Sequence, residues 1–540
     1  MEFDKLYLSA IQRALTIDEI VFEIGKNIGR IKDLSSASSC CKIWRKILSP
    51  LLVKNADVYI EDDTSFIEFL NSERSVARGC RALRVLPNIL GSLDMKKGIT
   101  STEGVANILG LLTIEGRLEH FMCALPEQLY APFPNDFFVS LKYFSNSLRE
   151  LNMTVCSGQW KTLFSIHFVC LRSLRLYLDS PNTLAETTYE IDLHHFLQKH
   201  QSLEMLDLYL GMCFDRMDFT GLRFASLYSL YIISRTPSIR LIRFLERQAS
   251  LRSLSVEIPV HHETQNEILS GETQERPVSP SSLQNLLALS LSLENIHWFK
   301  EILARGDNEM NQENMQPTSI SQKPGIRCLQ MTVGSITDLE QILQATTALK
   351  STLRAIDILI SNEDVAVKRI LENLNEAYPH LVELKLFAYS RSDTSEYSKE
   401  ASSTRGTYFQ QLVQWILPFI KYFNGNENFR AFSLITVNKN QLKTSQKLTG
   451  MEIDELTSYL SPVMSQEKQD DQINHSAPSH LEYIVWDDHL LRINRESGRI
   501  VSIMQTYPYE KPKRTQRSIW NPEWHDTMVL NHTYEDHVVQ

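Results

Sequence analysis

The sequence lacks the long apolar runs and the cysteine pairs that mark several protein classes. None of its windows approaches 18 consecutive apolar residues, so no membrane span is expected. The first 20 residues mix acids and bases into their apolar part, which does not fit a secretory signal. The eight cysteines are few for 540 residues and form no CxxC pair. We therefore expect reduced thiols and a cytoplasmic or nuclear protein.

Strong positive charge and catalytic motifs are also missing. The net charge is −10, whereas nucleic-acid-binding domains normally carry a basic patch, so no nucleic-acid partner is expected. No GxSxG, GxxxxGK[ST], GxGxxG or HExxH motif occurs. His195 and His200 are poorly spaced for binding one metal from a helix, and we expect both at the surface. The sequence predicts no enzyme activity, no metal and no cofactor.

Two helices are expected at the amino terminus. Apolar residues recur at helical spacing from Ile17 to Ile31, although Gly25 weakens that helix by about 1 kcal/mol relative to alanine. Asp33 can cap a second helix, which Pro50 should end because proline disfavours a helical residue before it.

The second predicted helix contains two adjacent cysteines and a tryptophan, Cys40, Cys41 and Trp44. Free cysteine behaves as a small apolar residue, and no further ligands at metal-binding spacing stand nearby. We therefore expect Cys41 and Trp44 to be buried between the helices, with no metal bound.

These segments resemble an F-box. The matching positions are Leu15, Glu19 with Ile20, Ile24, Ile28, Asp33 with Leu34, and Cys40 and Cys41 with Trp44. Thr16 stands where the family usually has proline. The resemblance implies a helical module over residues 1–55 that docks on the Skp-type linker subunit of a Skp–cullin–F-box ubiquitin ligase. The implied docking residues are Leu15, Ile20, Ile24, Leu34, Cys41, Trp44 and Leu48. An ordinary amino-terminal helical hairpin remains the alternative.

One template recurs through the rest of the chain: an apolar residue, two others, an apolar residue, one other, and an apolar residue. Nine clear copies begin at Leu148, Leu171, Leu203, Leu227, Leu251, Leu286, Ile326, Leu353 and Leu381, and weaker ones at Leu118, Phe429 and Leu481. The fourth and sixth template positions share one side of a strand. Segments with helical spacing precede many copies. Such units bury their apolar faces only when stacked.

The repeats resemble a divergent leucine-rich-repeat array. The resemblance implies an α/β solenoid over residues 56–505, with a curved parallel sheet inside and helices outside. The alternative is an irregular α/β domain with leucine-rich strands. Polar insertions are expected at about residues 262–282, 304–325, 390–407 and 438–480, the last with one helix over 451–460, and a tail over 506–540.

The fifth and seventh template positions should face the inside of the curve. On neighbouring repeats they supply a predicted target-binding surface of Arg175, Tyr177, Asp207, Tyr209 and Tyr231. Tyrosine and arginine often dominate binding interfaces, and the three tyrosines could form a ladder with steps of roughly 5 Å. Alternatively, they reflect strand propensity and pack on each other.

Together these features predict a substrate-recognition adaptor of a ubiquitin ligase. The amino-terminal module would bind the linker subunit, and through it a cullin, while the array would hold an unidentified protein target. The alternative is a repeat scaffold that binds partners without engaging a ligase.

Overall fold

The structure is a computed structural model, and its contacts divide the chain into two compact units. The first unit comprises residues 1–227 and 232–234, and the second comprises residues 228–231 and 235–540. The structure describes residues 17–28, 31–59, 63–72, 79–86, 101–114, 117–123, 132–156, 158–178, 188–210, 219, 221–233, 239–257, 277–279, 282–293, 295–304, 325–360, 367–389, 413, 419, 422–423, 426–437, 448–460, 481–486, 489–496 and 499–506.

The first unit begins with a three-helix bundle. Its helices are α2 (Asp18–Lys26), α3 (Ile31–Ser38) and α4 (Lys42–Leu52). Val21, Leu34 and Leu48 form the buried core, one from each helix, and half-buried residues such as Trp44 pack around them.

The bundle differs from the predicted pair of helices in where its helices end. The first helix stops at Lys26, before Ile31, and the second predicted helix is broken into α3 and α4. Side chains at the break favour it, because the hydroxyls of Ser38 and Ser39 both donate to the Ser35 carbonyl, at 2.7 and 2.9 Å. Pro50 lies inside the last turn of α4 and does not end it.

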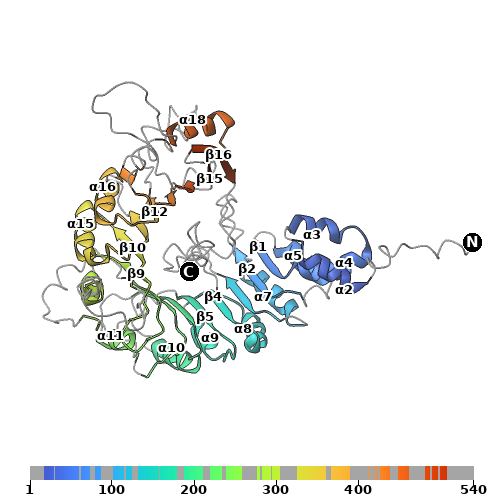
Figure 1. Cartoon of the computed structure of the whole chain (residues 1–540). Coiled ribbons are helices and arrows are strands. Elements are labelled where there is room, and N and C mark those ends of the chain that lie inside the picture. The colour runs from blue at the N-terminus through green and yellow to red at the C-terminus, as the bar shows by residue number, and fades with distance from the viewer. Residues whose placement is uncertain are drawn as a thin grey trace, which may run out of the picture. The chain divides into compact units, whose positions relative to one another are not determined.

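Six parallel strands follow the bundle and pair in chain order. They are β1 (Asn55–Tyr59), β2 (Ala82–Leu86), β3 (His120–Cys123), β4 (Glu150–Val155), β5 (Ser173–Leu178) and β6 (Met205–Leu210). The helices between them are α5 (Asp63–Ser72), α7 (Ser101–Leu112), α8 (Asn135–Tyr143), α9 (Trp160–Phe164) and α10 (Thr188–Lys199). Figure 1 shows α8, α9 and α10 on one face of these strands. Two strands, β1 and β2, precede every template copy identified in the sequence.

The second unit repeats the same arrangement. Its parallel strands are β8 (Ser253–Glu257), β9 (Ala288–Leu291), β10 (Cys328–Val333), β11 (Ala355–Ile360), β12 (Glu383–Tyr389), β13 (Ala431–Val437) and β14 (Tyr483–Trp486), each paired with the next. Helices α11 (Ile239–Leu245), α13 (Lys300–Leu303), α15 (Ile336–Ala345) and α16 (Val367–Ala377) alternate with them. Strand β7 (Ser229–Ile233) lies at the division between the units.

The carboxyl-terminal part of the array departs from the template. Strands β15 (His489–Glu496) and β16 (Arg499–Thr506) continue from β14 in antiparallel pairs, where the sequence predicts only further repeats. Helix α18 (Gly450–Leu460) forms where one was predicted within the last insertion. Most of the four predicted insertions, and the tail beyond Thr506, lie outside the described residues.

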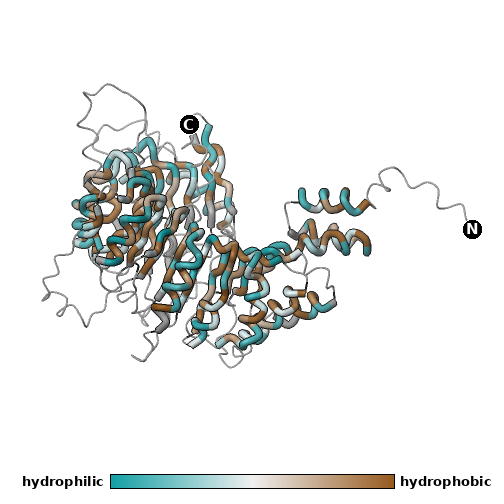
Figure 2. Tube along the Cα trace, turned by 90° about the horizontal axis from the view of Figure 1, so that it is seen from below, coloured by the Kyte–Doolittle hydropathy of each residue, from teal (hydrophilic) through white to brown (hydrophobic). Residues whose placement is uncertain are grey.

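The template predicts the core of each repeat correctly. In β5 the fourth and sixth positions are Leu174 and Leu176, and in β11 they are Ile356 and Ile358; none of the four is exposed. Figure 2 shows hydrophobic segments alternating with hydrophilic ones along the helices, as one-sided packing requires. The chain is therefore an array of leucine-rich strand–helix repeats in each unit.

Candidate partner-binding surfaces

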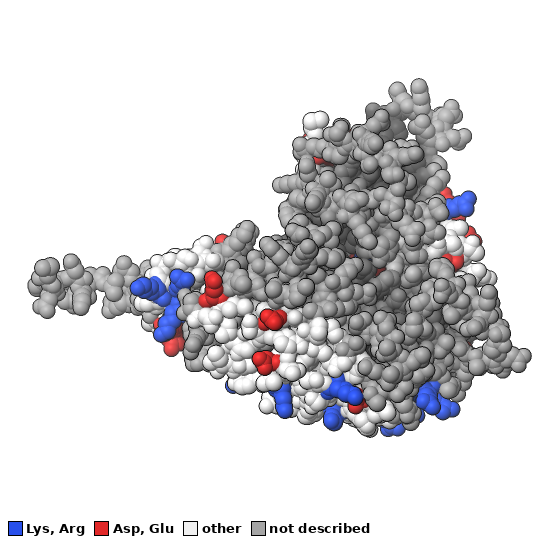
Figure 3. All heavy atoms as spheres, turned by 180° about the vertical axis from the view of Figure 1, so that it is seen from behind, with Lys and Arg blue, Asp and Glu red and all other residues white. Residues whose placement is uncertain are grey.

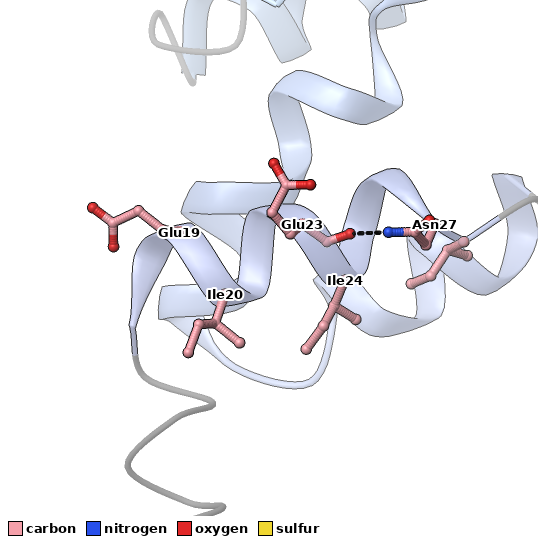
Figure 4. A pocket seen from close by; sticks show the side chains of 6 residues that line it. Glu19, Ile20, Glu23, Ile24 and Asn27 are labelled. Atoms are coloured by element: carbon pink, nitrogen blue, oxygen red, sulfur yellow. Dashed lines mark hydrogen bonds between the residues drawn. The ribbon is translucent and has the colours of Figure 1, made fainter.

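Helix α2 presents an apolar surface that nothing in the described bundle covers. Ile20 and Ile24 point away from the bundle on the same side of the helix (Figure 4), with 38% and 36% of their surface exposed. Ile17, just before the helix, is also exposed. A shallow depression on this side is lined by Glu19, Ile20, Glu23, Ile24, Asn27 and Ile28. The result is an apolar strip, which we call the α2 strip (Ile17, Ile20 and Ile24), bordered by acidic side chains.

The adjoining side of α2 is held closely against α4. Val21 is buried there, and a Cβ atom added to Gly25 would lie less than 3 Å from the side chains of Leu48 and Leu51. The glycine that weakens the helix in isolation thus permits its close approach to α4. Successive helical residues are about 100° apart, so Ile20 and Ile24, each one position before a residue packed on α4, lie on the flank of the helix beside this contact and remain partly exposed.

The structure separates the seven predicted linker-docking residues into different environments. Leu34 and Leu48 belong to the buried bundle core, so they are not part of a surface that a partner could contact. Trp44 is half-buried against that core. Ile20 and Ile24 lie on the α2 strip, Cys41 is exposed, and Leu15 lies outside the described residues.

The two adjacent cysteines lie at the break between α3 and α4, and the expectation that Cys41 is buried is wrong. Cys41 is the residue preceding α4, and its Sγ accepts the backbone N–H of Trp44 at 3.5 Å. Cys40 is exposed as well, and its thiol donates to the Ser36 carbonyl at 3.5 Å. In the described part of the chain, no three His, Cys, Asp or Glu side chains gather closely enough to hold a metal ion. The cysteines therefore act here as helix-terminal residues.

On the strands of the first unit, two predicted target-binding residues form a buried ion pair. Arg175 on β5 and Asp207 on β6 are in register, and the Arg175 Nε–H and Nη2–H groups approach Asp207 Oδ2 at 2.7 and 2.5 Å. Their side chains are 4% and 0% exposed. Burial by itself lowers the pKa of Arg175. The Asp207 carboxylate and the nearby Tyr177 and Tyr209 raise this pKa by more, so the net shift is upward. The pair is part of the repeat interior and is not a free recognition surface.

Two tyrosines beside this pair stack on each other. Tyr177 and Tyr209 are in register, and their ring centroids lie 4.2 Å apart with the planes inclined by 14°. Both side chains are half-buried. This part of the predicted ladder forms, and the tyrosines also pack on each other, as the alternative explanation required.

The third predicted tyrosine does not extend the surface. Tyr231 in β7 is only 1% exposed. In the template it stands at the fifth position, with Arg175 and Asp207, whereas Tyr177 and Tyr209 stand at the seventh. Tyr231 is therefore not accessible on these strands, and the candidate surface is reduced to the two stacked tyrosines.

The second unit contains a buried charge cluster that was not anticipated. Lys385 Nζ on β12 lies 3.3 Å from Asp357 Oδ2 on β11, and Glu383 is buried two residues before Lys385. Burial raises the pKa of Glu383 to about 8, with Lys385 lowering it and Asp357 raising it. Asp357 and Lys385 occupy the fifth template position, as Arg175 and Asp207 do. Charged residues at the fifth template position of adjacent repeats were therefore the sequence feature that could have predicted this buried cluster.

His200 is buried, contrary to the expectation of a surface histidine. Its Nε2 accepts the Phe168 backbone N–H at 2.9 Å, and its Nδ1–H donates to the Phe196 carbonyl at 2.6 Å. His195, by contrast, is exposed. The two histidines thus face different environments and do not form a common site.

Comparisons with known proteins identify no family for this chain. No family model matches the chain, and no curated protein matches it. Among solved structures, the leucine-rich repeat-containing protein LegL7 from Legionella pneumophila is similar at 11% identity and a TM-score of 0.25, over 76% of this chain and 92% of that one. The assignment of strand–helix repeats rests on the strand order and register of each unit.

Two further features concern membranes and charge: the length of the apolar helices and the distribution of charged side chains. No helix in the described ranges is both long enough and apolar enough to cross a membrane. Among the described residues on the face drawn in Figure 3, Lys and Arg side chains are interspersed with Asp and Glu and do not gather into one large basic patch. Among the described predicted contact residues, Ile20, Ile24 and Cys41 are exposed, and Trp44, Tyr177 and Tyr209 are half-buried.

Proposed function

We propose that this protein is a substrate-recognition adaptor of a Skp–cullin–F-box-type ubiquitin ligase, acting in the cytoplasm or nucleus. In this proposal, the α2 strip binds the Skp-type linker subunit, and through it a cullin. The repeat array holds a protein target. The chain itself supplies no catalytic residue; it raises the effective concentration of the target near a ubiquitin-charged enzyme.

The observation that supports docking is the α2 strip. A small bundle normally turns its isoleucines inward, and exposed apolar strips with polar borders mark protein-interaction sites. Here Val21 and Gly25 fill the interior instead, which leaves three isoleucines at the surface. The strip contains Ile20 and Ile24, which are positions of the F-box pattern. Glu19 beside it would favour a partner surface with basic or amide groups at its edge, whereas Glu23 is already paired with Lys26 at 2.6 Å.

The observation that supports target binding is the array itself. Strand–helix repeats build extended surfaces on which a partner can be held. Tyr177 and Tyr209 offer large, half-exposed aromatic rings whose stacking fixes their orientation, so little entropy is lost on binding. The buried Arg175–Asp207 pair would hold the two strands in register beneath the rings, without contacting the target.

The docking proposal predicts that Ile20→Ala and Ile24→Ala each weaken binding of a purified Skp-type linker subunit. Removing a central apolar anchor typically costs about 1–2 kcal/mol or more, so each change should lower the affinity roughly 10-fold. Binding of the full-length chain to the immobilised linker subunit measures this directly. Because both side chains already face outward, the circular dichroism spectrum should not change.

Val139→Ala provides the matched control. Val139 on α8 is 68% exposed and lies outside the bundle, so its truncation should leave the affinity unaltered. If the unmodified chain does not bind the linker subunit, or if the isoleucine variants bind as well as the Val139 variant, the docking role is wrong. The chain is then better described as an interaction scaffold that engages no ligase.

A further inference from the structure

The second template position forms a continuous row at the amino-terminal edge of the strands. In the second unit the residues of this row are linked through their backbones, each N–H donating to the preceding carbonyl at 2.7–2.8 Å. The row reads Arg252, Leu287, Arg327, Arg354, Val382, Arg430 and Glu482. Because neighbouring strands lie about 4.8 Å apart, this places several guanidinium groups in one line.

In the corresponding row of the first unit, each described arginine is paired with a glutamate of the same row. Glu119 lies 3.6 Å from Arg81 and 3.9 Å from Arg149, and Arg172 lies 3.0 Å from Glu204. Arginine and glutamate thus occupy the same template position on adjacent strands. Each of these three arginines therefore has a glutamate within 4 Å, with two glutamates serving three arginines.

Three arginines in the second unit lack such a carboxylate. Within the described ranges, Arg252 and Arg327 make no side-chain hydrogen bond or ion pair, and Arg354 donates only to the carbonyls of Ser351 and Leu353. Arg252 is exposed, and the other two are half-exposed. We call these three residues the rim arginines.

The surroundings of the rim arginines determine where the positive stretch ends. Lys350, exposed in the turn before β11, adds a further positive charge. On the far side, Arg430 is paired with Glu482 at 3.4 Å, and Glu427 is exposed nearby in the turn before β13. The uncompensated stretch therefore runs from Arg252 to Arg354.

We propose that the rim arginines bind an acidic protein segment that also carries apolar side chains. Guanidinium groups recognise carboxylates through paired, charge-assisted hydrogen bonds. Half-buried Leu287 lies between Arg252 and Arg327, and half-buried Val382 follows Arg354, so the row offers apolar contacts at the same spacing. A nucleic acid matches this pattern less well, because the chain carries a net charge of −10 and the positive row is one residue wide. This inference does not depend on the docking function of the α2 strip.

The test uses the full-length chain and two fluorescent eight-residue peptides. One peptide carries four Glu and two Leu, and the other has Gln in place of every Glu. The variants are the rim triple Arg252→Gln, Arg327→Gln, Arg354→Gln, and the first-unit triple Arg81→Gln, Arg149→Gln, Arg172→Gln. Both triples lower the net charge by the same amount, so the second is a matched control for long-range repulsion.

Fluorescence anisotropy should show that the Glu peptide binds at least 10-fold more tightly than the Gln peptide, and less tightly as salt is raised. The rim triple should lose at least 10-fold in affinity, and the first-unit triple less than 3-fold. Equal losses for the two triples, or equal binding of the two peptides, would overturn the proposal. Tighter binding of a 20-nucleotide single-stranded DNA would also do so. If the rim triple does not fold, Arg327→Gln alone replaces it. This variant should lose affinity for the Glu peptide several-fold, and an unchanged affinity would overturn the proposal.

Discussion

At the scale of single residues, buried polar groups tie successive repeats together. His200 accepts a backbone N–H from the turn before β5 and donates to a carbonyl of its own helix, α10. In the second unit, the hydroxyls of Thr346 and Tyr378 form a buried hydrogen bond with each other. Each contact gives a hydrogen-bond partner to a polar group that would otherwise be buried without one. His200 differs in that its protonation is linked to folding.

His200 should make the protein less stable in acid. Burial lowers the pKa of His200 to about 4, with the Phe196 carbonyl opposing this shift. Between pH 6.5 and about 4 the unfolded chain binds a proton that the folded chain does not, so stability should fall as the pH drops through this window. His200→Gln should flatten the decline, while lowering stability at pH 7 by about 1–2 kcal/mol through the poorer hydrogen bonds.

Urea unfolding of the full chain between pH 4 and 7 measures this effect. His195→Gln is the control, because that side chain is exposed and should leave the pH profile as it is. Parallel pH profiles for the His200 variant and the unmodified chain would show that His200 does not titrate in this way.

At the scale of elements, the junction between α4 and the strands is set by a close approach of two backbones. A Cβ atom added to Gly79 would overlap the Pro50 carbonyl oxygen and lie 2.6 Å from the Pro50 Cα. Next to this contact, the N–H groups of Arg81 and Ala82 donate to the Lys54 carbonyl at 3.0 and 2.9 Å. The glycine therefore lets the end of the bundle continue directly into the first pair of strands.

Gly79→Ala should destabilise the chain by about 1–3 kcal/mol, because a rigid backbone cannot move aside as a side chain can. Gly25→Ala should cost less, since the leucine side-chain ends that it meets can shift and the helix gains propensity. Thermal unfolding followed by circular dichroism compares the two. Gly450→Ala is the control, as no atom lies within 4 Å of its added Cβ. A Gly79 variant as stable as the Gly450 variant would rule out the tight junction.

At the scale of the molecule, the chain follows one rule almost throughout: each strand pairs with the strand before it. In such arrays the packing energy is mainly that of neighbouring repeats. Ion pairs between neighbouring strands also join adjacent repeats, as in Arg175–Asp207 and Lys385–Asp357. We therefore expect damage to one repeat to remain local.

Asp207→Ala tests this locality. Removing the carboxylate leaves the buried Arg175 charge without its partner, which typically costs about 3–5 kcal/mol. Hydrogen exchange should show lost protection in β4, β5 and β6, and unchanged protection in β11 and β12. A double change, Arg175→Met with Asp207→Leu, should restore much of the protection because no charge is then buried. Uniform loss of protection along the chain would contradict the expected locality.

The sequence by itself determined the repeat plan. Leucine spacing identified strands β4 to β12 and their inward positions, because alternation along a strand requires no knowledge of distant contacts. The same local reasoning identified the helix at 451–460. It missed β1 and β2, whose template copies begin with Val53 and Cys80 in place of leucine, and the antiparallel β15 and β16, which lack the template.

Only the tertiary structure decided which side chains remain accessible. Helical spacing placed Ile20, Val21 and Ile24 on one stripe, but contact with α4 selected Val21 and Gly25 for the interior. Likewise, template positions placed Arg175, Asp207 and Tyr231 on the inner face, where pairing with neighbours buries them. The physical reason is that periodicity fixes the direction in which a side chain points, whereas its exposure depends on what the neighbouring strand or helix places beside it.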